Sequence, residues 1–467
     1  MENKKNIRDE SSSQNGLLID EEKTEDIAEQ IQDLVEKDER PAAVELFSQL
    51  RPGDQGEVMD DLPLETRQEM LKALPPEEAA EILEHLEPGD AAEVSEGVDS
   101  SVLSDILDEA DSDVAADILR QLPEEHALDV LGEMEEAADI IPVLQYPDDS
   151  AGGRMVVEFV FVKDDATAAV ALDTLRKQEP EQVKDIRSVF VTDAEGRLAG
   201  ELSVARLALA GPGTKVRNIM ETDIVSVAVD TNQEECARVM ERYNLDQLPV
   251  VDAARQLVGV IMSEDIIDVI EEEATEDIYR LAGIPGERVF GSLILSMRNR
   301  LPWLSLNLVT LFLAALVIST FESTIAQFVT LAVFLPIVAG QGGIGGTQTL
   351  TLVVRSIALG EVSKKGGLRL LRREVILGLI HGLLLGVVVG LIAYFWKGNY
   401  MLGVVLGMAM IGNMIIAGLA GAGIPLVLTR LRVDPAVASA VIVTTCTDVI
   451  GFLLFLGLAT ALVTFLV

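Results

Sequence analysis

The C-terminal third of this 467-residue chain contains five apolar segments, each long enough to cross a lipid bilayer. A helix that spans the hydrocarbon core needs about 20 mostly apolar residues. The segments are expected at about 302–320, 326–354, 375–396, 401–428 and 436–467. Because lipid offers no hydrogen-bond partners to the backbone, segments of this length are expected to form a bundle of membrane-spanning helices.

The basic residues between these segments predict the orientation of the bundle. The second loop carries Arg355, Lys364, Lys365, Arg369, Arg372 and Arg373, and the fourth carries Arg430 and Arg432. The first loop has no basic residue and the third has only Lys397. Since basic loops stay in the cytoplasm, we expect a multi-pass protein of the plasma membrane with a cytoplasmic N-terminus and an extracellular C-terminus.

Asp448 lies well inside the last apolar segment. A carboxylate at membrane depth costs at least ~2.5 kcal/mol, so it normally faces a bundle interior or a water-filled path. Thr444 lies one helical turn earlier on the same face, and Thr445 and Thr447 add hydroxyl groups nearby. Oxygen ligands of this kind suit a hard cation. The pattern favours an ion path with Asp448 as its main ligand; the alternative is a buried aspartate bonded to a neighbouring helix.

The residues before Arg298 have the opposite character. They include 71 acidic and 25 basic residues, whereas the rest of the chain has 5 acidic and 11 basic ones. A soluble part this acidic argues against nucleic acid as a partner and fits divalent cations. Cys236 and Cys446 lie in different parts of the chain, which argues against a disulfide. Residues 1–20 are polar, lack the apolar stretch of a signal peptide and are expected to be disordered.

Residues 21–145 show a repetitive, acidic helical pattern. Leucine–proline pairs recur at Leu62-Pro63, Leu74-Pro75 and Leu122-Pro123, each close to acidic residues that are typical of helix starts. The short amphipathic segments between them indicate helices stacked at a steady interval, as in a small α-solenoid. An irregular helical bundle fits the pattern nearly as well.

Residues 146–273 alternate between expected strands and helices. The first unit has strands at 156–162, 188–192 and 198–202 and a helix at 166–177. The second has strands at 224–227, 247–251 and 257–262 and helices at 232–243 and 263–270. The two copies are about 65 residues apart, so this α/β region is predicted to be an internal duplication.

Specific motifs in this region resemble a known family. Leu248-Pro249-Val250-Val251-Asp252, followed by Leu257-Val258-Gly259-Val260, resembles the strand–turn–strand core of a CBS domain. With Tyr146 to Gly153 before the pair and Glu272-Glu273-Ala274-Thr275-Glu276-Asp277 after it, the chain from about Arg40 to Val467 resembles the MgtE family of magnesium channels.

This resemblance implies an overall organisation for the chain. It predicts a helical N domain (21–145), tandem CBS domains (146–273), a connecting, plug-like helical segment (274–300) and a five-helix transmembrane domain (301–467). It further implies a homodimer in membrane lipid, with Mg²⁺ as both substrate and regulatory ligand. Gly283, Pro285 and Gly286 argue for a break within the connecting helix.

The resemblance also implies regulatory magnesium sites in the soluble part. The matching residues are Asp265, Asp268, Glu273, Glu276, Asp277 and Glu234, with a looser match at Asp90 and Glu93. Asn232 and Asn244 stand where magnesium-sensing members carry aspartate. An acidic surface that serves only solubility is the alternative explanation. An adenine nucleotide is a further candidate ligand of the CBS pair, but no residue here decides it.

The second apolar segment contains Gly340-Gln341-Gly342-Gly343-Ile344-Gly345-Gly346-Thr347-Gln348-Thr349, which resembles the glycine-rich pore helix of the family. Glycine this dense is expected to kink or break the helix and to free backbone groups toward protein or water. The family motif carries asparagine at or near Ile344, and a polar amide is common at the position of Ala440. Both departures are expected to remove polar groups from the path. Asn413 is expected to form a hydrogen bond between helices.

The leading hypothesis is a channel-like magnesium importer gated by cytosolic Mg²⁺. A related transporter for cobalt, nickel or manganese and a CBS-regulated membrane sensor without transport remain alternatives. An intramembrane metalloprotease would need His-Glu-x-x-His, which His85, His126 and His381 do not form, so we expect no enzyme. A soft-ligand site is disfavoured, because Cys446 and His381 are the only thiol and imidazole in the membrane part.

Overall fold

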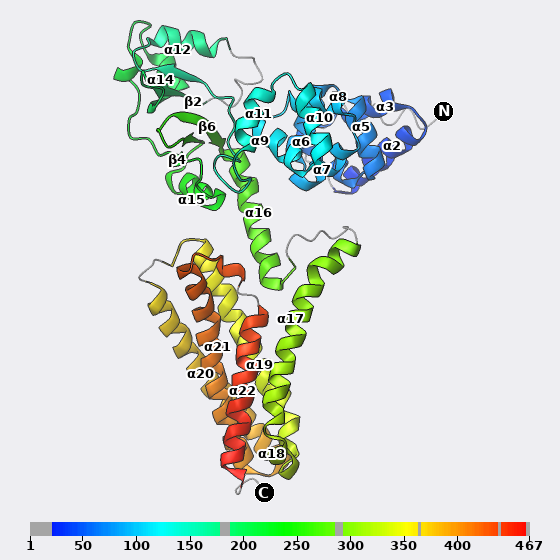
Figure 1. Cartoon of the computed structure of the whole chain (residues 1–467), viewed down its shortest axis with the longest axis vertical. Helices are drawn as coiled ribbons and strands as arrows, with labels where there is room; N and C mark the ends of the chain where they lie inside the picture. The colour runs from blue at the N-terminus through cyan, green and yellow to red at the C-terminus, as the bar shows by residue number, and fades with distance from the viewer. Residues whose placement is uncertain (1–20, 178–186, 285–292, 363–365, 438–439, 464–467) are drawn as a thin grey trace. The chain divides into compact units, whose positions relative to one another are not determined.

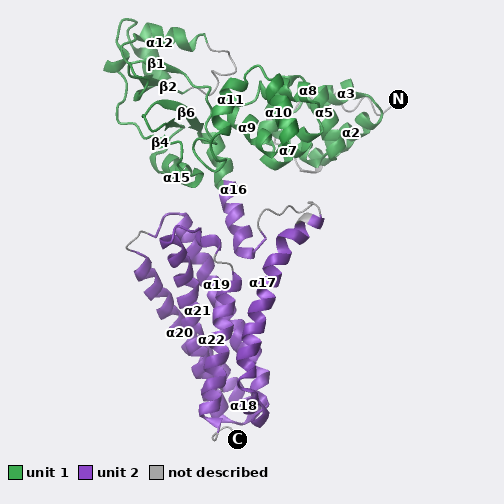
Figure 2. Cartoon of the chain, in the orientation of Figure 1, with its two compact units in different colours: residues 1–270 green, residues 271–467 purple. Residues whose placement is uncertain are grey.

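The computed structural model describes residues 21–177, 187–284, 293–362, 366–437 and 440–463. The chain divides into two compact units, residues 1–270 and 271–467, which are coloured separately in Figure 2. Residues 1–20, which are expected to be disordered, lie outside the described residues. Pro285, Gly286, Lys364 and Lys365 lie outside them as well.

The first unit begins with a series of short helices (Figure 1). They are α2 (Glu21–Glu36), α3 (Arg40–Phe47), α4 (Pro52–Asp61), α5 (Leu64–Ala73), α6 (Pro76–His85), α7 (Pro88–Glu96), α8 (Ser100–Leu107), α9 (Ser112–Gln121), α10 (Glu124–Glu133) and α11 (Ala137–Leu144). Helices α5, α6 and α10 start directly after Pro63, Pro75 and Pro123, as the leucine–proline pairs predict.

The packing of these helices follows a regular rule. Each packs against the next but one: α4, α6, α8 and α10 form one row, and α5, α7, α9 and α11 form the other. Contacts that are restricted to near neighbours in the chain are typical of a solenoid. The structure therefore supports the α-solenoid rather than an irregular bundle.

Two α/β repeats follow. The first contains β1 (Phe161–Lys163), α12 (Ala168–Leu175), β2 (Ser188–Thr192), β3 (Leu198–Ser203), α14 (Val204–Leu209) and the 3₁₀ turn η2 (Val216–Asn218). The second contains β4 (Val227–Ala228), α15 (Gln233–Tyr243), β5 (Gln247–Val251), β6 (Leu257–Met262) and α16 (Ser263–Ala282). In each three-stranded sheet the first strand pairs parallel to the second, and the second pairs antiparallel to the third.

The repeats are equivalent in detail, which confirms the internal duplication. Each sheet has one register shift, at Val191/Thr192 and at Val250/Val251, the corresponding positions of β2 and β5. Arg197 and Gln256, each preceding the third strand of its sheet, form a β-bridge with one another. Pairing between equivalent positions is what a local two-fold relation between the repeats produces.

One hydrophobic core joins the helical domain to the second repeat. It includes Phe47 and Ile106 of the helical domain, Cys236 and Ile261 of the second repeat, and Ile266 of α16. The start of α16 is therefore fixed by burial, and this positions the acidic residues of its first turns.

Among its described residues, the second unit contains five helices long and apolar enough to cross a membrane. They are Ser296–Ser319 within α17 (Leu293–Ser319), α19 (Thr330–Ala358), α20 (Gly367–Lys397), α21 (Tyr400–Arg430) and α22 (Ala440–Ala461). The five expected spans are thus present. The second starts four residues later than predicted, because the short helix α18 (Glu322–Gln327) lies before it. A 3₁₀ turn, η3 (Pro435–Val437), precedes α22.

The connecting segment is not one continuous helix. Helix α16 ends at Ala282, and Gly283 follows with a φ of 72°. This left-handed conformation suits glycine and ends a helix. The predicted break is therefore found at Gly283, and the next described helix, α17, begins at Leu293.

Candidate functional site

A groove of about 880 Å³ runs along helices α19 and α22 in the membrane domain. It is lined by Ala339, Gly340, Gly343, Ile344, Thr347, Gln348, Thr351, Leu352, Arg355, Thr444 and Asp448. Among the described lining residues, Asp448 is the one acidic side chain and Arg355 the one basic side chain. Oxygen atoms from hydroxyls, an amide and a carboxylate supply its acceptors, which suit a hard cation.

Asp448 is the chemically distinctive residue of the groove. Its carboxylate is partly buried, and within the described residues it forms neither a hydrogen bond nor an ion pair. A lone carboxylate at membrane depth is costly unless it meets water or a cation. Within the described residues, this position argues against an aspartate bonded to a neighbouring helix, and the ion path stays a prediction.

The three threonines near Asp448 have different environments. Thr444 lines the groove with Asp448, as their spacing of one turn predicts. Thr447 is fully buried, and its hydroxyl donates to the Thr444 carbonyl oxygen. Thr445 is not among the lining residues. The expectation that Thr445 and Thr447 would add oxygen ligands is therefore wrong for this groove, because helix geometry directs them away from it.

The glycine-rich segment of α19 does not break the helix, contrary to the sequence prediction. Helix α19 is continuous from Thr330 to Ala358. Its glycines instead allow close packing: a Cβ atom added at Gly346 would lie 2.6 Å from Val443 Cγ1 of α22. Small residues at helix interfaces bring backbones together in membranes. The glycines thus shape the groove wall by admitting neighbouring helices.

Asn413 acts between helices, as expected. It is fully buried in α21, and its Nδ2 donates to the Val338 carbonyl oxygen of α19 at 2.8 Å. This hydrogen bond joins α21 to the helix that lines the groove, and Asn413 itself is not part of the lining.

Of the two departures from the family motif, one faces the groove. Ile344 lines it with 58% of the side chain exposed, whereas Ala440 is not a lining residue. Ile344→Asn is expected to change the ratio of Mg²⁺ to Ca²⁺ flux, because it adds an amide to an apolar stretch of the wall. Competitive uptake into liposomes measures this ratio. An unchanged ratio in the variant would show that position 344 does not contact the permeating ion.

A second group of acidic residues surrounds the start of α16, in the first unit. The charge of Asp265 acts on Asp113 of α9 and on Glu84 of α6, and Asp111 acts on all three. The Asp111 amide donates to Glu84 Oε1 at 3.2 Å. The helical domain and the second α/β repeat thus present carboxylates to one another.

Burial raises the pKa values of these carboxyl groups. It raises that of Asp265 to about 7, with the negative charge of Asp111 adding to the effect. Burial, followed by the charge of Asp111, also raises the pKa of Glu84 to about 7. The pKa of Asp113 is raised well above its usual value, chiefly by burial. Such groups are stable in the folded protein only with a proton, a cation or water nearby.

One structural observation fits a divalent cation bound in this cluster. Asp113 Oδ1 is buried and has no hydrogen-bond partner within the described residues, although it lies beside the charge of Asp265. The two carboxylates, with Glu84 and Asp111 close by, would share a cation. The described residues contain no group of three or more His, Cys, Asp or Glu side chains arranged as a ready metal cage, so water would supply the other ligands.

Four other predicted sensor residues follow Asp265 along α16. Asp268 follows it by one turn on α16, and its charge raises the Asp265 pKa. Glu273, Glu276 and Asp277 lie in the half of α16 that belongs to the second unit. Glu276 pairs with Arg280 there. These positions agree with an acidic face along α16, and their role in magnesium sensing stays a prediction.

The remaining three predictions fall elsewhere. Glu234, at the start of α15, pairs with Arg238 at 3.7 Å. Asp90 lies on α7, where its charge acts on Asp60, and Glu93 lies on the same helix. The family resemblance pointed to Asp90 and Glu93 in the helical domain. The helical-domain residues whose charges interact with that of Asp265 are instead Glu84, Asp111 and Asp113, which the sequence did not single out.

The raised pKa values predict how stability depends on pH. Between about pH 4 and 7 the folded protein binds more protons at Asp265 and Glu84 than the unfolded chain does, so their stabilising effect is lost as pH rises through about 7. Without divalent ions, the Tm of the full protein in detergent is expected to fall between pH 5.5 and 8. The decrease should be smaller in Asp265→Asn, which is neutral at every pH. A parental Tm that stays constant or rises over this range would contradict the buried cluster.

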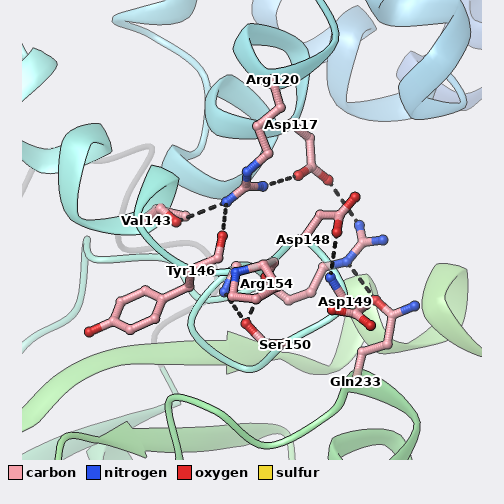
Figure 3. A network of polar contacts seen from close by, with 11 residues as sticks. Asp117, Arg120, Val143, Tyr146, Asp148, Asp149, Ser150, Arg154 and Gln233 are labelled. Carbon is pink, nitrogen blue, oxygen red and sulfur yellow. Dashed lines mark hydrogen bonds and ion pairs between the residues drawn. The ribbon is translucent and has the colours of Figure 1, made fainter.

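Beside this cluster, ion pairs connect α9 to the segment that enters the first CBS repeat (Figure 3). Asp117 accepts from Arg120 and, at 3.0 Å, from Arg154. Arg154 also donates to Gln233 Oε1 at 2.9 Å, and Arg120 donates to the carbonyl oxygens of Val143 and Tyr146. These partly buried bonds fix the helical domain against the CBS pair independently of any metal ion.

Comparisons with known proteins agree with this architecture. The family model described as a divalent cation transporter matches residues 335–458, the MgtE intracellular N domain matches 22–101 and 50–149, and the CBS domain matches 151–212 and 216–272. The magnesium transporter MgtE of Bacillus subtilis is 35% identical over 332 residues, covering 71% of this chain and 73% of that protein. The chain belongs to the MgtE family. It is therefore a member of a family of multi-pass membrane transporters.

Other MgtE proteins show the same extent of similarity. The magnesium transporter MgtE of Thermus thermophilus is 36% identical over 326 residues, covering 69% of this chain and 72% of that protein. A solved structure described as the cytosolic domain of the Mg²⁺ channel MgtE in complex with ATP is 34% identical, covers 52% of this chain and 99% of that chain, and has a TM-score of 0.48. Nucleotide binding by this MgtE-family chain stays a prediction.

Proposed function

We propose that this protein imports Mg²⁺ through a channel-like pore whose ion ligand is Asp448. One observation carries the proposal: a carboxylate without an ion-pair or hydrogen-bond partner in the described residues lies in a groove between membrane helices. Mg²⁺ dehydrates reluctantly and keeps several waters, so it is bound through few protein ligands. The relatives are named magnesium transporters, and the oxygen ligands of this groove suit Mg²⁺.

The pore is proposed to form between two copies of the chain. Asp448 is only partly buried in a single chain, and Ile344 on the same groove is 58% exposed. Two such grooves facing one another would enclose a path with one Asp448 on each side. The basic second and fourth loops support a cytoplasmic soluble part and an extracellular C-terminus.

Gating by cytosolic Mg²⁺ completes the proposal. Cations between Asp113 and Asp265 would offset the repulsion of buried carboxylates and hold the soluble domains together. Within the second unit, Arg280 of α16 pairs with Asp434, and Leu281 packs against a cluster that includes Leu350 of α19. The end of α16 is thus in contact with the pore-lining helix, and a movement of α16 would reach the pore.

The test is ion flux by the purified full-length protein in liposomes. Mg²⁺ influx above that of protein-free liposomes is expected, with weaker competition by cobalt and nickel, because the described lining of the groove contains no thiol or imidazole. No flux would favour a CBS-regulated sensor without transport. Faster cobalt or nickel flux than Mg²⁺ flux would favour the related transporter. An adenine nucleotide at the CBS pair is a separate proposal, tested by the shift of Tm on adding ATP.

A further inference from the structure

A second, smaller cavity lies on the other side of the pore-lining helix. Its volume is about 140 Å³, enough for a few water molecules. It is lined by residues of α19, α20 and α21, among them Gln348, Leu352 and Glu374. Gln348 and Leu352 also line the ion groove. Both cavities therefore border α19 at these residues, and a rotation of this helix alters both.

Glu374 is the unusual residue in the lining of this smaller cavity. It lies on α20 within the membrane part, yet it is 4% exposed. One carboxylate oxygen accepts from Arg373 at 3.0 Å, and the other accepts from the Thr349 hydroxyl of α19 at 3.4 Å. A buried carboxylate is costly unless it is paired and hydrogen-bonded, so Glu374 depends on these two partners. Its hydrogen bond to Thr349 connects it directly to α19.

The backbones at this point approach closely because α21 carries glycine. A Cβ atom added at Gly418 would lie 2.5 Å from the Glu374 carbonyl oxygen, and one added at Gly421 would lie 2.9 Å from Thr349 Cβ. Helix α21 thus contacts both members of the Glu374–Thr349 pair, and three helices meet around one polar contact.

We propose that Glu374 is a positioning residue for the pore: through Thr349 it fixes the rotation of α19 and with it the presentation of Gln348 and Leu352 to the ion groove. The inference rests on the proposed ion path along α19. Thr349 immediately follows Gln348, so a rotation of the helix at Thr349 turns the groove-lining amide by the same angle. Glu374 is not among the described residues that line the groove.

The test uses variants that remove the Glu374–Thr349 contact from either side, together with matched controls. Thr349→Val keeps the shape and removes the hydroxyl, whereas Thr349→Ser keeps the hydroxyl. Glu374→Met keeps the length and removes the acceptor without leaving a buried charge. Thr429→Val, at an exposed threonine of α21 whose hydroxyl bonds to its own helix, is the control. The readout is the ratio of Mg²⁺ to Co²⁺ flux in liposomes, with apparent Mg²⁺ affinity and maximal flux measured separately.

Thr349→Val and Glu374→Met are each expected to change the flux ratio about threefold or more, the size expected for one interhelical hydrogen bond. The double variant should change it no further, because both substitutions break the same contact. Thr349→Ser and Thr429→Val should keep the parental ratio. Lower maximal flux at an unchanged ratio in both single variants, or additive effects in the double variant, would overturn the inference. Absence of Mg²⁺ flux in the parent protein would instead refute the proposed function.

Discussion

Asp448→Asn is expected to lose most of the divalent-cation uptake while the protein still folds. Asparagine has nearly the same shape, so the substitution removes the charge and little else. A carboxylate about 4–5 Å from a hydrated divalent ion contributes ~2 kcal/mol even at the dielectric constant of water. This corresponds to a loss of about 20-fold or more in ion occupancy, and a second Asp448 across a dimer would enlarge the loss. Asp448→Ala should have at least as large an effect.

The matched control for this prediction is Glu361→Gln. Glu361 is an exposed acidic residue of the membrane unit that does not line the groove, so the variant should transport like the parent. Initial Mg²⁺ influx into liposomes, divided by the amount of folded protein, measures all three variants. Full transport by Asp448→Asn would mean that Asp448 is not an electrostatic site for the ion. It would contradict the proposal that the ion path runs along this groove.

Much of the fold could be predicted because its signals are local. Strands β2, β5 and β6 begin and end at the expected residues or within one residue of them, since each is a short β-branched run between turn residues. The break in the connecting segment was predicted from Gly283, Pro285 and Gly286, and at Gly283 it reflects a positive φ, which is a property of one residue. The alternation of CBS strands and helices and the five apolar spans follow from periodicity and length in the same way.

The errors arise where the outcome depends on residues far away in the chain. Dense glycine in α19 suggested a break, but Val443 of α22 and Asn413 of α21 fill the space beside these glycines, and the helix continues. Spacing alone also placed Thr447 near the ion, whereas its burial against α19 is a tertiary effect. Local sequence patterns indicate which conformations a backbone segment can adopt, and its tertiary contacts determine which of them forms.

The acidic cluster was found only in part for the same reason. Asp265 stands out in the sequence by local acidity, but Asp113 and Glu84 lie more than a hundred residues away among many similar side chains. A weak signal was present: Asp113 lies in the first turn of a helix with a strongly apolar face, where burial of a carboxylate is plausible. The proximity of Asp113 on α9 to Asp265 on α16 is a tertiary effect beside the shared core, which no sequence spacing reveals.

The second large effect is expected from the regulatory acids. Replacing Asp265, Asp268, Glu273 and Glu276 with alanine should raise the Mg²⁺ concentration needed for closure about tenfold or more, a coupling free energy of ~1.4 kcal/mol. Mg²⁺ can close the pore only if it binds the closed state more tightly than the open state. At physiological salt, exposed charges more than about 8 Å apart are largely screened, so the dense acids of α16 matter more than the total charge of the soluble part.

The control must remove the same charge from elsewhere. Glu29, Glu124, Glu133 and Glu241 are exposed acidic residues of the first unit outside α16, and their quadruple alanine variant has the same net charge as the test variant. Mg²⁺ protection of the soluble part from protease and Mg²⁺-dependent closure in liposomes are measured for both variants. We expect the test variant to lose protection and to close at higher Mg²⁺, while the control behaves like the parent. Equal shifts in both variants would show that the acidic surface acts through net charge alone. Parental behaviour of the test variant would exclude feedback through α16, because its four carboxylates would then not bind the ion that closes the pore.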